Sequence, residues 1–372
     1  APQFGSRQQI ARQLAQRGHK ILFVNIARTI HSFVSDPSGT RQALRRLGQV
    51  SQIDDNLSVY TPWPLLPIYY NPLINSINQP LFLADLRRLL KRLNWQIDVL
   101  WSYWPNTAYL IGRLRERVSV YHCIDDFVAV GYPLTTRNAI ASMEAKQCRK
   151  VDLILTRTVG LNTLKKEYNP NTHLLPGGVD LTHFNPEVTR HARADVKDLP
   201  SPRVGLLGTI DDRVDVPLLT YCAQALPDIT FAFVGPVKHH RVNLSTLTNL
   251  PNVHLLPACT YAEVPAIMNA FDVCLIPYLL NSYTRALSPI KLYEYLALGK
   301  PVIATELPYL MREADTITIA KSPSDFVTAI QTALTLPITA SEKADRRAVA
   351  AQQAWSHQVD QIENYLALLL EP

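Results

Sequence analysis

Two charged side chains, Lys291 and Glu294, lie three residues apart near the start of a predicted helix. Ser288 has the side chain of a good N-cap and Pro289 suits the first helical position, so Lys291 falls in the third. The positive end of the helix dipole disfavours a cation at that position by ~0.3–1 kcal/mol. A bound anion would remove this conflict, and free backbone N–H groups at the helix start would bind the same anion. The spacing therefore predicts an anion site, suited to a diphosphate, at Lys291.

Glu294 would lie one turn along the helix on the same face as Lys291. Its carboxylate is placed to accept hydrogen bonds from the hydroxyls of a ribose attached to that diphosphate. The alternative interpretation is a surface pair between the two side chains, worth ~0.3 kcal/mol. The spacing alone leaves both interpretations open.

A second group of reactive side chains, His122, Asp125 and Asp126, follows the predicted strand at residues 118–121. Active groups in doubly wound sheets gather outside the carboxyl ends of strands. The two adjacent aspartates would face different directions in an extended backbone, so we do not expect a shared-proton pair. We predict Asp125 as the first choice of general base, Asp126 as the second and His122 as the third. Helix capping or turn formation by both aspartates is the alternative.

Short apolar runs alternate with helical patterns along most of the chain, which is typical of parallel sheets in α/β proteins. The predicted strands are residues 21–25, 99–101, 118–121, 153–155, 204–207, 231–234, 253–256, 273–276 and 302–304. The predicted helices are residues 7–17, 83–93, 216–225, 261–269, 289–298 and 324–334. Since 372 residues exceed the usual size of one domain, we expect two Rossmann-like, doubly wound lobes with a cleft between them.

The best linker between the lobes is the charged, proline-bearing stretch at residues 186–202. It predicts an N-terminal lobe at 1–195 and a C-terminal lobe at 196–345. A final helix at 346–372 would return to the first lobe. The first helical pattern starts at Arg7, whereas a Rossmann-like half normally opens with a strand, so the opening strand is either missing or displaced.

Composition excludes several classes of protein. The five cysteines are odd in number and widely spaced, which favours buried thiols in the cytoplasm over a disulfide or zinc framework. The longest apolar runs fall well below the ~20 residues of a membrane span, and the start of the chain lacks the pattern of a signal peptide. No side chains show metal-ligand spacing, so we expect neither a metal nor a cofactor.

The net charge of +6 is concentrated on the predicted helix at 83–93, which carries both leucines and cations. The cations are Arg87, Arg88, Lys91 and Arg92. One interpretation is a helix that packs its leucines in the core, and the other is a face for a membrane surface or an anionic acceptor. Nucleic-acid binding is not expected, because no recognised motif is present.

The segment at 288–304, Ser-Pro-x-Lys-x-x-Glu-Tyr-Leu-Ala-x-Gly-Lys-Pro-Val-Ile-Ala, resembles the nucleotide-sugar signature of GT-B fold glycosyltransferases. The resemblance is to the family-4-like bacterial enzymes of surface polysaccharide or glycolipid synthesis. It extends along most of the chain, in family order, through residues 7–20, 175–184, 205–208 and 272–277. It implies a glycosyltransferase that moves a sugar from a nucleoside-diphosphate sugar, of UDP or GDP type, to the hydroxyl of a glycan or lipid-linked acceptor.

The resemblance also implies roles for individual residues of the donor site. Lys291 would hold the donor diphosphate, Glu294 the ribose, and the backbone of Ser288, Pro289 and Ile290 a phosphate oxygen. Relatives of this family place a catalytic or donor-positioning His or Asp where this chain has residues 122–126. They manage leaving-group charge with side chains and a helix dipole, so a metal-independent reaction is expected.

Three further positions follow from the same resemblance. Arg213, beyond the turn at Gly208, would be a second phosphate contact, with a solvated arginine as the alternative. Tyr261 lies where relatives enclose the base, mostly through backbone. Retaining relatives often carry an acidic residue where this chain has Ala286, which argues against a retaining mechanism.

The acceptor chemistry would place the protein in the cytoplasm, at the inner face of the cell membrane. Two alternative functions share the predicted nucleotide site. One is a nucleotide-sugar epimerase of GT-B fold, and the other is a non-catalytic protein that binds sugar nucleotides.

Overall fold

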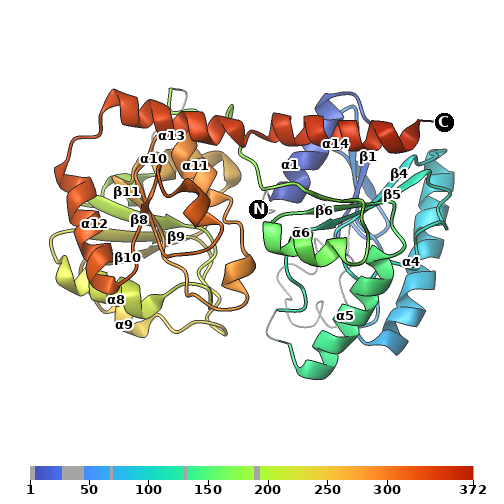
Figure 1. The fold of residues 1–372 in the computed structure, drawn as a ribbon, viewed down its shortest axis with the longest axis horizontal. Helices are drawn as coiled ribbons and strands as arrows, with labels where there is room; N and C mark the ends of the chain where they lie inside the picture. Colours follow the sequence, from blue (N-terminus) through green and yellow to red (C-terminus); the bar gives the residue numbers. More distant parts are fainter. Residues whose placement is uncertain (1–4, 27–45, 68–69, 130–131, 188–192, 372) are drawn as a thin grey trace. The chain divides into compact units, whose positions relative to one another are not determined.

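The computed structural model describes residues 5–26, 46–67, 70–129, 132–187 and 193–371, in two compact units (Figure 1). The N-terminal unit comprises Arg7–Pro176 and Val359–Pro372. The C-terminal unit comprises Gly177–Gln358 together with Ala1–Ser6. The predicted boundary at residue 195 is therefore wrong, because the chain joins the C-terminal unit at Gly177. Residues 188–192 of the predicted linker lie outside the described residues.

The early boundary has a packing cause. Val179 and Phe184 are each 1% exposed and belong to the core of the C-terminal unit. Val179 also pairs with the end of that unit: its N–H donates to Gln353 O at 2.9 Å, and its oxygen accepts from Trp355 N at 3.1 Å. Burial and backbone pairing thus attach this segment to the second unit, ahead of the charged stretch.

The C-terminal unit contains a six-stranded parallel sheet in the order β10-β9-β8-β11-β12-β13. Its strands are β8 (Arg203–Leu207), β9 (Thr230–Val234), β10 (Val253–Leu256), β11 (Val273–Ile276), β12 (Val302–Ala304) and β13 (Thr318–Ile319). In chain order this reads third, second, first, fourth, fifth, sixth, the arrangement of a doubly wound dinucleotide-binding fold. The central strands are apolar and buried, as expected for strands covered on both faces.

Helices cover both faces of this sheet. Figure 1 shows α8, α9 and α12 on one face and α10, α11 and α13 on the other. The bounds are α7 (Ala194–Lys197), α8 (Val216–Ala225), α9 (Ser245–Thr248), α10 (Val264–Asn269), α11 (Lys291–Ala297), α12 (Pro323–Thr335) and α13 (Ala340–Gln352). Short 3-10 turns are η1 (Tyr261–Glu263), η2 (Thr284–Ala286) and η3 (Leu310–Glu313).

The N-terminal unit contains two sheets, one of order β1-β3-β2 and one of order β4-β5-β6-β7. Their strands are β1 (Ile21–Val24), β2 (Val50–Gln52), β3 (Leu57–Tyr60), β4 (Val99–Ser102), β5 (Val118–Cys123), β6 (Leu153–Thr156) and β7 (Thr172–Leu174). All pairs are parallel except β2 with β3. The expected α/β class with parallel sheets in both halves is confirmed.

The helices of this unit are α1 (Ser6–Gln16), α4 (Pro72–Leu93), α5 (Leu134–Cys148) and α6 (Val159–Lys166). α4 is longer than predicted, because Asn71 caps it by accepting hydrogen bonds from Leu73 N and Ile74 N. Among the described residues α1 comes before β1, with no strand ahead of it. None of the helices in the described ranges is both long and apolar enough to cross a bilayer.

The final segment forms two helices where one was predicted, α13 and α14 (Trp355–Leu370). The break at Gln353 and Ala354 exposes the backbone groups that pair with Val179. Beyond the break, Glu363 of α14 contacts Arg17 at 2.5 Å and His19 at 2.8 Å in the N-terminal unit. The last residues thus group with the first unit, as expected for a helix that returns to it.

Candidate functional site

The carboxyl ends of β8 and β11 form the centre of the candidate site. These neighbouring strands lie where the strand order of the C-terminal sheet reverses, which is where doubly wound folds bind ligands. The loops that follow them are tied together. Leu279 N donates to Arg213 O at 2.8 Å, and Asp215 N donates to Pro277 O at 2.8 Å. The two loops therefore form one connected rim at the switch point.

Lys291 reaches this rim at Gly208, the first residue after β8. Gly208 has a φ of +139°, a conformation that only glycine adopts without strain. A Cβ there would lie 2.9 Å from Lys291 Nζ. The same ammonium lies 5.3 Å from the ring centroid of Tyr278, which follows β11. The Lys291 ammonium thus lies beside the backbone of Gly208, at the switch point where an anionic ligand would bind.

α11 holds Lys291 in place through its buried face. Tyr295 is fully buried, and its hydroxyl accepts a hydrogen bond from Leu207 N at 3.2 Å. Leu292 and Leu296 are also fully buried in the core of the unit. Lys291 and Glu294 share the opposite, partly exposed side of the helix, which confirms that they lie on one face.

The predicted start of this helix was wrong. α11 begins at Lys291, with Ile290 as the capping residue and no side-chain cap, so Ser288 is not the N-cap and Pro289 is not the first helical residue. A tight turn precedes the helix: Leu292 N donates to Pro289 O, and Tyr293 N to Ile290 O, both at 3.1 Å. Because these two N–H groups are already hydrogen-bonded, fewer backbone N–H groups at the helix start can bind an anion than the sequence predicted.

Ser288 has a different feature of interest. It is 7% exposed, and its Oγ has no hydrogen-bond partner among the described residues. Burying a hydroxyl without a partner costs free energy, on the order of 1–3 kcal/mol. An oxygen-rich ligand bound beside the turn would supply the missing acceptor.

Burial raises the pKa of Glu294 to about 7, and the neighbouring Lys291 offsets part of that rise. A carboxyl with this pKa is close to half ionised at neutral pH. Its charge state is therefore sensitive to whatever binds against it.

Arg213 is held by a carboxylate, which contradicts the alternative of a freely solvated arginine. Its Nε and Nη2 donate to the two oxygens of Asp211 at 2.7 and 2.8 Å. Its guanidinium carbon also lies 5.8 Å from the centroid of the Tyr278 ring. Asp211 and Tyr278 thus position Arg213 on the same rim as Lys291.

Tyr261 opens η1 and is stacked on His183. The two ring centroids are 4.0 Å apart and the planes 14° from parallel. His183 Nε2 also lies 2.8 Å from Tyr261 O, and Thr260 caps the turn in a box with Glu263. The segment after Gly177 therefore fixes the ring and backbone of Tyr261 from one side.

His122 is enclosed within β5 of the N-terminal unit. Its ring lies 5.2 Å from that of Tyr103 and 5.8 Å from that of Trp101, measured between centroids. Burial, with smaller effects from Arg157 and Arg7, lowers the pKa of His122 to about 3. So weak a base has little driving force to accept a proton at neutral pH, and this argues against His122 as the general base.

The two aspartates beyond β5 have separate environments. Asp126 Oδ1 accepts hydrogen bonds from Val128 N at 3.1 Å and Ala129 N at 3.0 Å, so it caps a turn. This is the alternative role considered for the pair, and it engages Asp126 Oδ1 with the backbone of its own turn. Asp125 is partly exposed, and its backbone oxygen accepts from Cys123 Sγ at 3.5 Å.

The structure brings Gly208, Arg213 and Lys291 together on one rim and keeps Glu294 on the helix beside it. Asp125, Asp126 and His122 belong to the other unit. Sequence reasoning missed Tyr278, although a tyrosine directly after a central strand at the switch point was a usable signal. It also missed Asp211 and His183, whose partners depend on the folded loops.

Thr284 and Arg285 directly precede Ala286, the position where retaining relatives often carry an acidic residue. Thr284 is fully buried, and its hydroxyl donates to Leu279 O and Asn281 O within its own loop. Arg285 is exposed. Within the described ranges, no three His, Cys, Asp or Glu side chains gather as a metal site would require.

Comparison with known proteins finds a family match within the C-terminal unit. Residues 201–335 match the family described as Glycosyl transferases group 1. The chain is 26% identical over 293 residues to the putative teichuronic acid biosynthesis glycosyltransferase TuaH of Bacillus subtilis (strain 168). That alignment covers 72% of each protein.

Solved structures share the whole fold. Sucrose-phosphate synthase from Thermosynechococcus elongatus superposes with a TM-score of 0.72 at 16% identity, covering 98% of this chain and 92% of its own. Anabaena HepE, solved in complex with UDP and glucose, gives a TM-score of 0.63 at 15% identity, covering 94% and 99%. At these identities the likeness establishes the fold, which is that of GT-B glycosyltransferases.

Proposed function

With a Glycosyl transferases group 1 domain at residues 201–335 on a GT-B fold, the chain is a glycosyltransferase, and we propose that its C-terminal unit binds the nucleoside diphosphate of a sugar donor. The observation that carries this proposal is the position of Lys291 Nζ beside Gly208 at the sheet's switch point. The relatives named above give no support to an epimerase.

The donor would contact residues of three loops. Lys291 and Arg213 supply two cations for the diphosphate, and the buried Oγ of Ser288 can donate to a phosphate oxygen. Glu294 can accept hydrogen bonds from the ribose hydroxyls. Tyr261, stacked on His183, presents backbone and ring to the base of a UDP- or GDP-type donor.

Lys291 and Arg213 can stabilise the charge of the leaving group without a metal ion. Two cations on one rim would stabilise the negative charge that develops on the departing diphosphate. We therefore propose transfer without a resident metal or cofactor. Asp125 in the N-terminal unit is the proposed base, and it would accept the proton of the attacking acceptor hydroxyl.

The acceptor class is proposed from chemistry and from the named relative. TuaH is described as a putative teichuronic acid biosynthesis glycosyltransferase. We propose a glycan or glycolipid hydroxyl as the acceptor, reached at the cytoplasmic face of the membrane.

The direct test of the donor site is calorimetric titration with UDP, GDP and ADP. One nucleotide should bind to the native chain. Lys291→Ala and Glu294→Ala should each weaken that binding about 10- to 100-fold, since each removes a charged hydrogen-bonding partner worth about 1.5–3 kcal/mol. Lys321→Ala, which removes an exposed lysine of the same unit, is the matched control and should bind like the native chain. Failure of all three nucleotides to bind would refute the proposed site.

Nucleotide affinity should also depend on the ionisation of Glu294. The carboxylate, not the neutral acid, accepts two ribose hydrogen bonds, so binding favours the ionised form. Because the pKa of Glu294 is about 7 in the free protein, affinity should fall about tenfold as the pH drops from 8 to 6. Titrations of native protein and Glu294→Gln over this range separate this effect from protonation of the nucleotide itself. Equal pH slopes for the two proteins would exclude Glu294 from the ribose site.

Membrane contact is proposed for the outer face of α4. Leu83, Leu86 and Leu89 pack inward, which confirms the core interpretation of that helix. Leu73, Ile77 and Leu81 instead form a row of exposed apolar side chains at helical spacing, a row that sequence reasoning missed. Arg87 and Arg92 donate to the carbonyl oxygens of Arg113 and Gly48, while Arg88 and Lys91 are exposed.

Vesicle sedimentation tests this face of α4. The native chain should bind vesicles of phosphatidylcholine with phosphatidylglycerol more tightly than vesicles of phosphatidylcholine alone. Serine at Leu73, Ile77 and Leu81 together should reduce binding at least tenfold, because about 1 kcal/mol of burial is lost at each position. Leu336→Ser removes one comparably exposed leucine from the other unit and should have no effect. Unchanged binding by the triple variant would place membrane contact elsewhere.

A further inference from the structure

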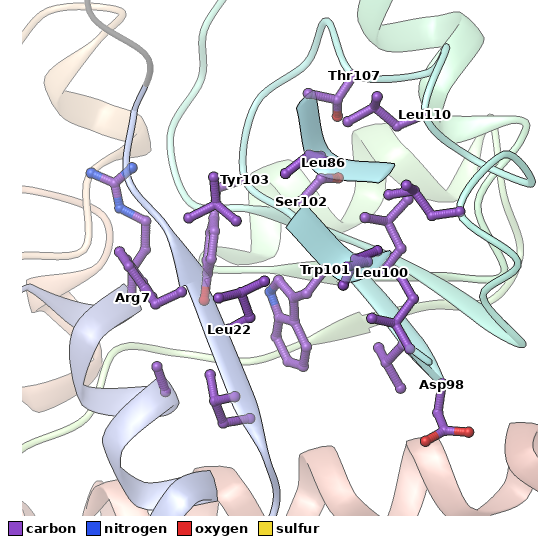
Figure 2. A pocket seen from close by; sticks show the side chains of 18 of the residues that line it. Arg7, Leu22, Leu86, Asp98, Leu100, Trp101, Ser102, Tyr103, Thr107 and Leu110 are labelled. Carbon is purple, nitrogen blue, oxygen red and sulfur yellow. The ribbon is translucent and has the colours of Figure 1, made fainter. Parts of the chain in front are cut away.

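Two aromatic side chains, Tyr103 and Trp104, open the loop that follows β4 in the N-terminal unit. Figure 2 shows Tyr103 and Thr107 of this loop beyond the end of β4, where Ser102 lies. β4 pairs in parallel with β5, so the loops after the two strands leave the sheet at the same edge. This carboxyl edge is where doubly wound sheets bind their ligands.

The loop after β5 meets the loop after β4 through a third aromatic ring, that of Phe127. Phe127 follows Asp125, the proposed base, and Asp126 in the chain. The ring centroids of Phe127 and Trp104 are 5.6 Å apart, and the ring planes are tilted by 39°. Both side chains are half-buried, so part of each remains open to solvent. Trp104 and Phe127 thus form an aromatic platform on the loops beside the proposed base.

A buried amide fixes the loop that carries Trp104. Gln147 of α5 is 0% exposed, and its Nε2 donates to Trp104 O at 2.8 Å. The same side chain donates to Ser102 Oγ at 3.0 Å and accepts from Thr107 N at 2.8 Å. These bonds join both ends of the loop to one helix, so the backbone of Trp104 is held in place before any ligand binds.

The turn that carries Phe127 is fixed by two other side chains. Asp126 caps it by accepting from Val128 N and Ala129 N. Arg137 of α5 donates to Val128 O at 2.9 Å. Both rings therefore stand on loops that side chains hold by hydrogen bonds. A ligand that stacks on these rings would pay little to order them.

The chemistry of the aromatic platform fits a sugar ring. One face of a pyranose presents C–H groups, which contact the electron-rich face of an aromatic ring favourably. The hydroxyl groups at the edge of the sugar stay free to hydrogen-bond. A glycosyltransferase must hold its acceptor so that one hydroxyl reaches the base. A lipid chain would also contact the rings, but it would offer no hydroxyl to Asp125.

The charges near the aromatic platform have both signs. Asp125 and Asp126 contribute carboxylates from the loop after β5. Arg7 lies against Tyr103, with its Cζ 5.8 Å from the ring centroid, and Arg137 is the guanidinium that bonds to the turn after β5. Carboxylates on the same loop would repel a phosphate group, so an uncharged sugar fits this surface better than an anionic head group.

We propose that the rings of Trp104 and Phe127 bind a sugar ring of the acceptor and direct one of its hydroxyls to Asp125. This inference rests on the proposed function. It narrows the acceptor from any glycan or glycolipid hydroxyl to a hydroxyl carried by a sugar ring, and it makes Trp104 a residue that determines acceptor affinity.

The first test measures transfer of radiolabel while the amount of bacterial lipid extract is varied. Trp104→Ala should raise the half-saturating amount about tenfold, because the sugar loses the ring on which it stacks, and should change the limiting rate less than about threefold. Trp104→Phe keeps an aromatic face and should recover most of the affinity. Trp95→Ala is the matched control, since Trp95 is also half-buried but precedes β4, at the opposite edge of the sheet.

The second test does not depend on transfer. Glycans released from the same extract by mild acid should change the tryptophan fluorescence of the native chain. Trp95→Phe should keep this change, whereas Trp104→Phe should lose it, because the reporting ring is removed. Phe127→Ala should need a higher glycan concentration for the same change. Nucleotide affinity, measured by calorimetry with UDP, GDP and ADP, should be native in all these variants, because the proposed donor contacts belong to the other unit.

Three outcomes would overturn the proposal. A half-saturating amount that rises no more in Trp104→Ala than in Trp95→Ala would remove Trp104 from the acceptor site. A lower limiting rate with unchanged half-saturation would make its ring a support for the Asp125 loop only. A fluorescence change with the intact extract but none with the released glycans would assign the aromatic platform to the lipid part of the acceptor. Failure of the donor site is a separate result, since no nucleotide would then bind to the native chain, and the glycan titration would still decide the role of Trp104.

Discussion

Replacing Asp125 by alanine should lower the rate of sugar transfer by about 100- to 10,000-fold, the usual range for loss of a general base, and leave nucleotide affinity unchanged. Asp125 is our first choice among Asp125, Asp126 and His122. The Asp126 carboxylate is occupied by the backbone N–H groups of Val128 and Ala129, and the pKa of His122 is lowered to about 3. Nucleotide affinity should persist because the proposed diphosphate contacts all belong to the C-terminal unit.

The measurement is transfer of radiolabel from UDP- and GDP-sugars to a lipid extract of bacterial membranes. Asp125→Asn should lose as much activity as Asp125→Ala, because the amide keeps the shape but not the basicity. Asp126→Asn is the matched control, since an asparagine oxygen can still cap the turn and the rate should change little. A larger loss in Asp126→Asn or His122→Gln would move the base to that residue.

Much of the C-terminal unit was predictable because its signals are local. The strands at residues 204–207, 231–234 and 273–276 are continuous apolar runs, and such runs mark parallel strands buried on both faces. The spacing of Lys291 and Glu294 likewise fixes their shared face once a helix forms. Short or mixed strands such as β2, β7 and β13 were missed, since two or three residues carry no readable period.

The errors have a common physical cause, which is pairing between distant residues. The terminal helix breaks because Gln353 O and Trp355 N bond to Val179, about 175 residues earlier in the chain. The same contact moves the boundary between units to Gly177. Local helical periodicity continues across the break, so no pattern within the segment could have revealed it.

The candidate site could likewise be predicted only in part. The sequence indicated an anion site at Lys291, on one helix face, and a glycine turn at Gly208. The rim also depends on Tyr278 and on the Asp211 pair with Arg213, which form only when the loops after β8 and β11 meet. The start of the helix was predicted wrongly, because a tight turn precedes it. The backbone hydrogen bonds of this turn, donated by Leu292 N and Tyr293 N, replace the serine cap that was expected.

The N-terminal unit has its own structural dependence on one buried carboxylate, Glu144, and Glu144→Ala should destabilise it by about 3–5 kcal/mol. Glu144 and Lys165 are each 3% exposed, and their charged atoms are 2.8 Å apart. Tyr121 donates to the same carboxylate at 2.7 Å. Burial alone would lower the pKa of Lys165, but Cys123 and Glu144 outweigh it and raise that pKa. Removing Glu144 leaves a buried ammonium without its counter-charge.

Urea unfolding followed by tryptophan fluorescence measures this loss, since four of the five tryptophans belong to the N-terminal unit. Glu167→Ala removes an exposed carboxylate close in sequence to Lys165 and should change stability by less than about 0.5 kcal/mol. The double variant Glu144→Leu with Lys165→Met should recover part of the stability, because it leaves no unpaired buried charge, although the Tyr121 hydroxyl loses its acceptor. A double variant as unstable as the sum of its single variants would show that the ion pair is not what the unit depends on. The loss would then come from the packing and hydrogen bond around Tyr121.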